Sequence, residues 1–383
     1  MQVLERGQSL EALAEYAQEA GNRDGRLVLV SGEAGVGKTT LLDEFAQIAP
    51  QARWLRAACD GLSTPRPLGP LVDIAGEVGG ELLQQCRDRV ARDEIFATAQ
   101  GEFDQPGVLT VVVIEDIHWA DESTLDLLRY VGRRLRGAAI LLIATYRDEG
   151  LAPDDPLRIV LGDLSTLPTS RRVSVAPLSA EAVAELATGT GLDPSELYRL
   201  TGGNPFFVSE ALCTPEDRIP PSARDAVLAR VARLSDDARQ AVRTAALIGT
   251  SFDPALLTAI AVAEALVLDE LLSSGLLVSD DRTLRFRHEI TRLAVEQDVP
   301  AYRRTSIHAR ILVALMAAGC EDESMLAHHA EGADDGDAAF GLAVRAGDRA
   351  AELSSHREAI AQYERALRFA GKEQPAIVAD LYD

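Results

Sequence analysis

Short apolar runs alternate in the first half of the chain with segments whose apolar positions recur at helical spacing. The runs are rich in β-branched and aliphatic residues, and they predict strands at residues 27–31, 53–58, 109–114, 137–145 and 172–175. Helical patterns lie in several of the intervals, and Gly79-Gly80 breaks the pattern between residues 71 and 100 into two or three helices. Strands that alternate with helices predict a parallel, doubly wound sheet.

The pattern changes twice after this α/β region. Helical segments broken at Thr188–Gly191 and Thr201–Pro205 follow Pro177, and the region 235–300 then predicts three helices and two short strands. The strands, 276–279 and 284–287, turn at Asp280-Asp-Arg282, which is the element order of a winged helix. Its third helix has no cation but three acidic residues: Glu264, Asp269 and Glu270. Since nucleic-acid affinity depends on cations, we expect a structural winged helix.

The last segment is helical throughout. Residues 356–369 have the apolar spacing of a tetratricopeptide second helix, with a partner helix near 337–352. An ordinary amphipathic helix pair is the alternative interpretation. One repeat does not bury its own apolar face, so we expect the array to continue in a longer native chain.

These changes of pattern predict four domains. The expected order is an α/β nucleotide-binding domain, a helical lid, the winged helix, and a helical linker that leads into the repeats. Their predicted bounds are 1–176, 177–234, 235–300 and 301–383.

Composition limits the possible functions. The net charge of −22 opposes nucleic-acid binding by the chain as a whole, and charge clusters such as Arg133–Arg136 are expected to be solvated helix faces. We find no apolar run near the ~18 residues that span a bilayer, and no signal peptide. The four cysteines lack metal-ligand spacing and are expected to be buried thiols of a cytoplasmic protein: Cys59, Cys86, Cys213 and Cys320.

The sequence GEAGVGKTT at residues 32–40 fits the phosphate-binding template Gly-x4-Gly-Lys-Thr. A predicted strand precedes it and a predicted helix follows it, which is the context that the motif requires; a chance glycine-rich turn is the alternative. Glycines allow the backbone amides to turn inward, and the helix directs its positive end at the phosphates. We expect nucleotide contacts from the loop residues Gly32, Ala34, Gly35, Val36, Gly37, Lys38, Thr39 and Thr40.

Lysine usage supports this interpretation. Among 38 basic residues only Lys38 and Lys372 are lysines, and one of them lies in the loop. A compact ammonium on a flexible stem reaches β- and γ-phosphates, whereas a planar guanidinium fits poorly. We therefore expect Lys38 to stabilise phosphate charge, and the Thr39 hydroxyl to bind Mg²⁺.

Two acidic residues follow the apolar run 109–114. Glu115 and Asp116 are expected at the carboxyl end of a core strand, where ligands bind in open α/β sheets. A carboxylate there holds Mg²⁺, and a second one orients the attacking water. We therefore predict Glu115 and Asp116 as metal and catalytic residues. Of the residues that follow, Trp119 is expected to pack and Asp121 to cap the helix 122–136.

Arg147 follows the next predicted strand and is expected at the same sheet edge. A guanidinium there senses the γ-phosphate or offsets charge in the transition state. The alternative is a surface ion pair with Asp148 or Glu149.

The order of five motifs resembles the STAND class of P-loop ATPases. They are GEAGVGKTT, VVVIEDIHWAD, LLIATYR, LTGGNPFFVSE and LRFRHEI. The closest likeness is to the large ATP-binding regulators of the LuxR type, relatives of the maltose activator. The resemblance covers roughly residues 1–370. It departs from the family at Glu115-Asp116, where Asp-Asp is usual, and the family's DNA-binding helix-turn-helix would lie beyond residue 383.

The resemblance implies further nucleotide contacts. The Arg6 region and the Gly203-Asn204-Pro205 turn would flank adenine, and His288 would touch the ADP phosphate and lock a closed state. Two alternatives stay open, because Pro205 also suits a simple helix break and His288 also suits an interdomain histidine with only a packing role.

The resemblance implies a nucleotide-dependent switch of a transcriptional regulator. ADP would hold the domains closed, whereas ATP, with an inducer or protein partner at the repeats, would permit self-association. Hydrolysis would be slow, and DNA would be bound only by a region outside this chain. There are three alternative functions. The first is a DNA-processing motor, which the negative charge disfavours. The others are the ATPase module of a signalling enzyme such as a nucleotide cyclase, and a scaffold that does not hydrolyse ATP.

Overall fold

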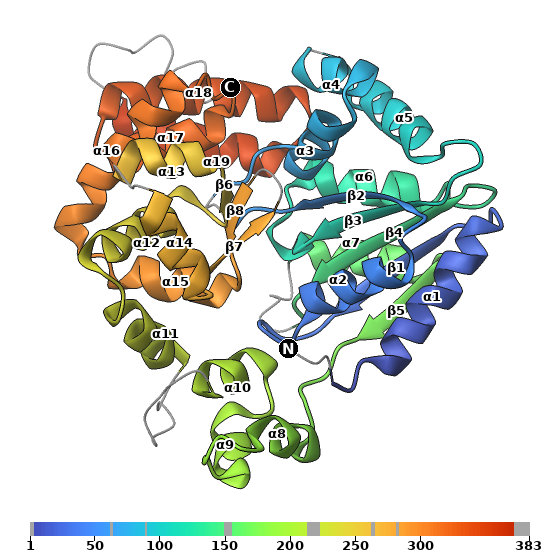
Figure 1. Ribbon diagram of the computed structural model, residues 1–383. Helices are drawn as coiled ribbons and strands as arrows, with labels where there is room; N and C mark the ends of the chain where they lie inside the picture. The colour runs from blue at the N-terminus through green and yellow to red at the C-terminus, as the bar shows by residue number, and fades with distance from the viewer. Residues whose placement is uncertain are drawn as a thin grey trace. The chain divides into compact units, whose positions relative to one another are not determined.

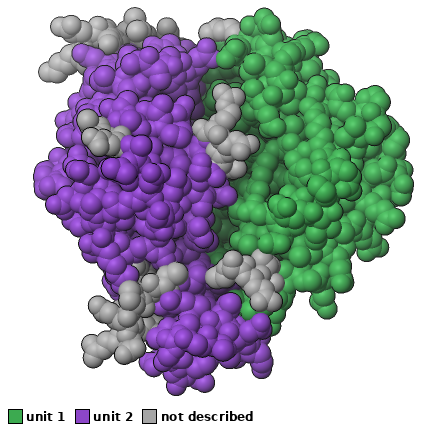
Figure 2. All heavy atoms as spheres, viewed as in Figure 1, with its two compact units in different colours: residues 1–60, 65–178, 349–358 green, residues 61–64, 179–348, 359–383 purple. Residues whose placement is uncertain are grey.

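The computed structural model describes residues 4–61, 64–88, 90–148, 155–212, 223–261, 265–280 and 283–370. The chain divides into two compact units, which Figure 2 shows in green and purple. Unit 1 contains Met1–Asp60, Pro65–Leu178 and Arg349–Glu358. Unit 2 contains Gly61–Thr64, Ser179–Asp348 and Ala359–Asp383. The division into four domains, with the bounds given above, stays a prediction.

Unit 1 contains a five-stranded parallel sheet in the order β2-β3-β4-β1-β5 (Figure 1). Every predicted strand of this region is present within a few residues of its expected bounds. The strands are β1 (Arg26–Ser31), β2 (Arg53–Ala58), β3 (Thr110–Glu115), β4 (Ile140–Tyr146) and β5 (Ser170–Ser174). The predicted parallel α/β sheet is thereby confirmed.

Helices cover both faces of this sheet because its strands are apolar on both faces. Along β1, Val28 and Val30 pack in one cluster with α1 and α2, whereas Leu27 and Leu29 pack in another with α3 to α7. The helices of unit 1 are α1 (Gly7–Gly21), α2 (Lys38–Ile48), α3 (Gly69–Val78), α4 (Gly80–Arg87), α5 (Arg92–Phe103), α6 (Glu122–Gly132) and α7 (Pro156–Ser165).

Two local predictions in unit 1 can be checked directly. The expected break at Gly79-Gly80 separates α3 from α4, since both glycines have positive φ. Asp121 caps α6 as expected, and its side chain accepts from the Thr124 amide. Cys59 and Cys86 are buried free thiols, Cys320 is a partly buried one, and Cys213 lies outside the described residues.

The described part of unit 2 is helical apart from one small sheet. The predicted breaks near 188–191 and 201–205 are present, between helices α8 (Ala180–Ala187), α9 (Pro194–Thr201) and α10 (Pro205–Leu212). Next come α11 (Ala223–Ala232), α12 (Asp236–Ile248), α13 (Pro254–Ala261) and α14 (Ala265–Ser273).

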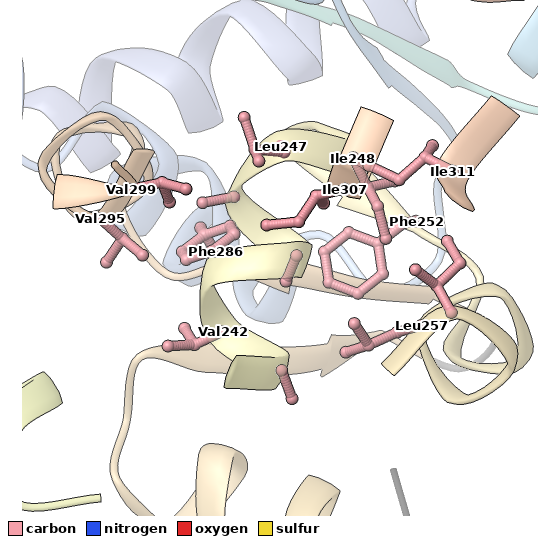
Figure 3. Packing of buried hydrophobic residues seen from close by; sticks show 14 of the residues in the cluster. Val242, Leu247, Ile248, Phe252, Leu257, Phe286, Val295, Val299, Ile307 and Ile311 are labelled. Atoms are coloured by element: carbon pink, nitrogen blue, oxygen red, sulfur yellow. The ribbon is translucent and has the colours of Figure 1, made fainter. Parts of the chain in front are cut away.

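The predicted hairpin of unit 2 is present and has a third strand. Strands β7 (Leu277–Asp280) and β8 (Thr283–Phe286) pair antiparallel, and β6 (Ser251–Phe252) pairs with β8. Figure 3 shows how Phe252 and Phe286 pack against apolar residues of the surrounding helices. The expected helices and strands are thus in place, and their assignment to a winged helix stays a prediction. Glu264 and residues 281–282 of the expected turn lie outside the described residues.

Five further helices complete the described chain: α15 (Glu289–Asp298), α16 (Ala301–Ala317), α17 (Glu323–Gly332), α18 (Gly336–Glu352) and α19 (His356–Phe369). The last two match the predicted helix pair, while their identity as tetratricopeptide repeats stays a prediction. Among the described residues, no helix combines the length and apolar character needed to cross a bilayer.

Candidate nucleotide-binding site

The loop between β1 and α2 has the backbone that the glycine pattern predicts. Gly35 and Gly37 have φ values of 78° and 98°, in the left-handed region that side chains disfavour. Gly32 has a φ of 152°, and a Cβ there would lie 2.6 Å from the Val175 carbonyl oxygen. The loop therefore needs glycine both for its turns and for its close approach to the end of β5.

Lys38 is the first residue of α2, and its side chain contacts the backbone of the loop. Its ammonium donates to the carbonyl oxygens of Gly32, at 2.7 Å, and Glu33, at 3.0 Å. Only 7% of the residue is exposed. Burial lowers the pKa of Lys38, and the negative charge of Asp116 acts in the opposite direction. The loop thus holds an ammonium at the positive end of a helix, where an anionic ligand is favoured.

A hydrogen bond joins this loop to the end of β3. The Thr39 hydroxyl donates to Glu115 Oε2 at 2.7 Å, and Glu115 is 9% exposed. The structure therefore brings together two of the residues that the sequence predicts as Mg²⁺ ligands.

Arg56 on β2 is a member of this group that the sequence analysis did not find. Its Nε donates to Glu115 Oε1 at 2.7 Å, and its Nη1 donates to Asp43 Oδ1 at 2.5 Å. Burial acts to lower the pKa of Arg56, but the carboxylates of Glu115 and Asp43 together outweigh it and raise that pKa. Parallel pairing of Ala58 with Glu115 places Arg56, two residues earlier, on the same face of the sheet. Arg56 could not be assigned to the site from the sequence because the pairing register of β2 with β3 is known only from the folded sheet.

Asp116 has an unusual backbone. Its φ is 56°, which is sparsely populated for residues other than glycine. The amide of Asp116 donates to the Thr145 hydroxyl at 2.9 Å, which ties it to β4. Its carboxylate Oδ1 lies 3.8 Å from His118 Nδ1.

His118 and Trp119 lie in a short 3-10 helix, Ile117–Trp119, directly after these acids. Burial lowers the pKa of His118 to about 3, and the positive charges of Arg147 and Lys38 lower it further. Both ring nitrogens are buried without a hydrogen-bond partner in the described part of the chain. His118 is therefore a neutral imidazole close to the loop, and the sequence analysis gave it no role.

Arg147 follows β4 and its guanidinium lies 6.0 Å from the centre of the Trp119 ring. Trp119 in turn packs against the apolar core, as expected. Arg147 therefore lies at the same sheet edge as the acids. Glu149, one partner in the alternative interpretation, lies outside the described residues.

Arg6 is a buried residue that contacts the backbone of the loop. Its Nη2 donates to the carbonyl oxygens of Val36, at 3.0 Å, and Ala176, at 2.9 Å, and the residue is 5% exposed. This guanidinium fixes the backbone of the loop against the segment that follows β5. A contact between Arg6 and adenine stays a prediction.

Pro205 and His288 belong to unit 2, whereas the loop belongs to unit 1. Pro205 begins α10, and the Asn204 side chain accepts from the Phe206 amide at 3.1 Å. The Phe206 ring packs edge-on against His288, with ring centres 4.6 Å apart. Two motifs of the sequence analysis therefore meet within unit 2, and their contacts with nucleotide stay predictions.

Comparisons with known proteins agree with this geometry. Residues 2–143 match the family described as "AAA ATPase domain". An uncharacterized protein from Rhizobium meliloti (strain 1021) is 28% identical over 304 residues, which cover 70% of this chain and 29% of the relative. The chain thus spans under a third of the length of that relative.

The fold is similar to that of a solved STAND protein, a signal transduction ATPase with a tetratricopeptide repeat sensor from Pyrococcus horikoshii. The TM-score is 0.61 at 16% identity, over 96% of this chain and 59% of that one. Cdc6p from Pyrobaculum aerophilum gives a TM-score of 0.40 at 14% identity, over 78% of this chain and 96% of that one, which is too weak to support an inference. Likeness to LuxR-type regulators is not among these findings. Residues 2–143 therefore match an AAA ATPase domain, and the fold of the chain is similar to that of a STAND ATPase.

Proposed function

We propose that the chain binds ATP and ADP with Mg²⁺ and acts as the nucleotide-dependent switch of a larger signalling protein. The hydrogen bond between Thr39 and Glu115 carries this proposal. It joins the phosphate-loop hydroxyl to the carboxylate at the end of β3, which β4 separates from β1, in a buried place at the carboxyl end of a parallel sheet. Ligands of α/β proteins bind in such places.

The residues of the site fit a polyphosphate. Positive φ values at Gly35 and Gly37 give the loop the backbone of an anion-binding nest, and Lys38 adds a buried positive charge. A phosphate oxygen would accept a hydrogen bond from the ring N–H of the buried, neutral His118, and a water would donate to its other ring nitrogen. Arg147 would stabilise charge on the terminal phosphate.

The residues also fit a magnesium ion. A threonine hydroxyl and a carboxylate are oxygen ligands of the kind that Mg²⁺ prefers. Thr39 and Glu115 would hold the ion, while Asp116, held by Thr145, would position the attacking water. The ion, when bound, would neutralise phosphate charge.

Arg56 supports the expectation of slow hydrolysis. Both oxygens of Glu115 are engaged, one by Thr39 and one by Arg56. A guanidinium beside a metal ligand opposes a dication and reduces the negative charge that the carboxylate offers. The same observation favours a second candidate function, a scaffold that binds nucleotide without hydrolysing it.

The output of the switch is proposed from the fold that the chain shares with a STAND protein. Arg6, Pro205 and His288 would contact the nucleotide and sense its state. An inducer or protein partner would bind the C-terminal helices, and the ATP state would self-associate. The regulated output would be transcription, through a DNA-binding region outside this chain, with a nucleotide cyclase as the alternative output.

Nucleotide binding is tested with a fluorescent ADP analogue and the purified chain. Lys38→Ala should weaken binding at least tenfold, because it removes the only cation within the loop. Lys372→Ala replaces the other lysine of the sequence and is the matched control. Equal affinity of wild type and Lys38→Ala would refute the proposed site.

Single-turnover hydrolysis of ATP separates the switch from the scaffold. The wild type should release phosphate slowly, and Glu115→Gln and Asp116→Asn should each reduce the rate further while nucleotide binding persists. A wild-type rate that equals the rates of both variants would favour the scaffold.

A further inference from the structure

Three histidines of unit 2 meet where α16 packs against α17. His308 lies on α16, and His328 and His329 are consecutive residues of α17. The ring centres of the three pairs are 5.5, 5.1 and 5.1 Å apart. Only six histidines occur in the whole chain, so half of them gather at this one helix pair.

The nitrogen atoms of this His308–His328–His329 cluster are close enough to share one ion. One ring nitrogen from each residue lies within 4.8 Å of the other two, and His308 Nδ1 is 2.9 Å from His329 Nδ1. Zinc–nitrogen bonds of about 2.0–2.1 Å in a tetrahedral site place ligand nitrogens roughly 3.4 Å apart. Side-chain adjustments of about an ångström would therefore form the site.

The cluster presents neutral imidazoles in a shielded place. His329 is fully buried, His308 is 8% exposed, and His328 is partly exposed, which gives an ion a path from solvent. Burial lowers the pKa of His308 and His328 to about 4 each and that of His329 further. Neutral imidazole is the form that binds metal.

A hydrogen-bonded histidine pair explains only part of this arrangement. One neutral imidazole can donate to the other, which accounts for the contact of His308 with His329. It does not account for the third ring, nor for His329 Nε2, which is buried without a hydrogen-bond partner among the described residues. Buried polar atoms of this kind call for a ligand or an ordered water.

Gly332 adds a steric argument. A Cβ at this position would lie 2.5–2.8 Å from three ring atoms of His308. The absence of a side chain therefore lets the His308 ring lie against the end of α17, one turn after His328 and His329. The two helices approach closely at the point where the three rings meet.

The charges around the cluster are largely balanced. Arg292, Arg304 and Arg365 lower the pKa of cluster members, so their positive charges face it, as does the negative charge of Glu331. Arg292 pairs with Glu289 and Glu296, and Arg365 pairs with Glu331. Arg304 donates to the carbonyl oxygens of Val299 and Glu296. Ion pairs thus offset two of the three cations that would oppose a dication.

We propose that His308, His328 and His329 bind a divalent transition-metal ion of the zinc class, with a fourth position open to water or another ligand. Imidazole nitrogens suit Zn²⁺, Ni²⁺, Cu²⁺ and Co²⁺, whereas Mg²⁺ and Ca²⁺ prefer oxygen. The ion would link α16 to α17 and stabilise this helix pair against separation. The site lies in unit 2 and is independent of the proposed nucleotide function.

The first test is a titration of the metal-free full chain with Co²⁺ and Zn²⁺. Four-coordinate Co²⁺ gives intense visible absorption, and Zn²⁺ should displace it at one ion per chain. X-ray absorption of the wild-type zinc complex should show nitrogen ligands of the imidazole type. Spectra with oxygen ligands only, or the absence of binding at one equivalent, would overturn the proposal without any variant.

The second test uses variants with a matched control. His308→Gln, His328→Gln and His329→Gln should each weaken Zn²⁺ binding at least tenfold, measured by competition with a chromogenic chelator. His356→Gln changes an exposed histidine outside the cluster and should bind like the wild type. Glu115→Gln is a second control, because it removes a competing site in unit 1. Zinc binding that survives in the cluster variants but is lost in Glu115→Gln would refute the assignment.

Discussion

Lys38 and Glu115 were predictable from the sequence because each belongs to a motif with a fixed relation to a strand. Glycine spacing identified the loop, and a β-branched run placed the acids at its end. Arg56 was not predictable in this way, since nothing in the segment RWLRAA marks one of its two arginines. Its role depends on the pairing of β2 with β3, which is a property of the folded sheet.

The contact of Arg56 with Glu115 leads to a specific prediction for the proposed metal site. Removal of the Arg56 side chain leaves Glu115 with more negative charge for a cation, so Arg56→Ala should lower the Mg²⁺ concentration that half-saturates ATP hydrolysis several-fold. The measurement is the initial rate as a function of free Mg²⁺ at constant ATP.

Arg53→Ala is the matched control for this experiment. Arg53 is also on β2 and pairs with Glu102 instead, at 2.7 Å, so its loss should leave the Mg²⁺ dependence unchanged. If Arg56→Ala abolished nucleotide binding at every Mg²⁺ concentration, Arg56 would be a nucleotide ligand or essential for the position of Glu115, contrary to the role argued above.

Helices and strands were predictable where the apolar pattern was long. They were missed where the pattern was short, or where the main evidence for a helix was its N-terminal capping residue. The apolar pattern predicts no element between residues 148 and 171, although α7 occupies Pro156–Ser165. Asp155-Pro156 is a helix start, with a side chain that caps the helix and a proline at its first position. Strand β6 has two residues, too few for any periodicity. The histidine cluster lies on two helices, and His308 becomes a neighbour of His328 and His329 only when those helices pack.

Asp121 provides a test of capping at the scale of an element. Its carboxylate accepts from the Thr124 amide and hydroxyl and from the Leu68 amide, and only 1% of the residue is exposed. Removing it leaves two buried amides without a partner, at about 1–3 kcal/mol each before relaxation. Burial raises the pKa of Asp121, so loss of the carboxylate also relieves some desolvation. We expect Asp121→Ala to destabilise unit 1 by about 2–4 kcal/mol.

Urea unfolding followed by tryptophan emission measures this loss, because Trp54 and Trp119 are the only tryptophans in the sequence and both lie in unit 1. Asp155→Ala removes a single capping bond from α7, to the Leu157 amide at 2.9 Å, and should cost about 1 kcal/mol. Equal losses in the two variants would contradict the argument from burial.

At the scale of the molecule, the division into two units is what a nucleotide switch would use. The sheet and the phosphate loop are in unit 1, whereas the predicted adenine and phosphate sensors, Pro205 and His288, are in unit 2. The sequence predicted the order of these regions along the chain from changes of hydrophobic period. The proposed cooperation between the two units would depend on conformational states and their nucleotide affinities, which a hydrophobic period does not encode.

A switch requires that ATP and ADP bind two states of the chain with different affinity, since a ligand that binds both equally shifts nothing. To raise the population of one state from about 1% to about 99%, a ligand must bind that state roughly 10⁴-fold more tightly than the other state. We therefore expect sedimentation velocity to show a larger mass with ATP and Mg²⁺ than with ADP, at the same chain concentration. By reciprocity, association should raise the affinity for ATP over ADP by the same factor.

The Lys38→Ala variant should have the same mass in ATP as in ADP, equal to the mass of the wild type in ADP. The reason is that this variant lacks the ammonium that we propose contacts the phosphates. If wild type has one mass in ATP, in ADP and without nucleotide, association is not the readout of the switch, and the nucleotide preference must then appear in binding of the partner instead.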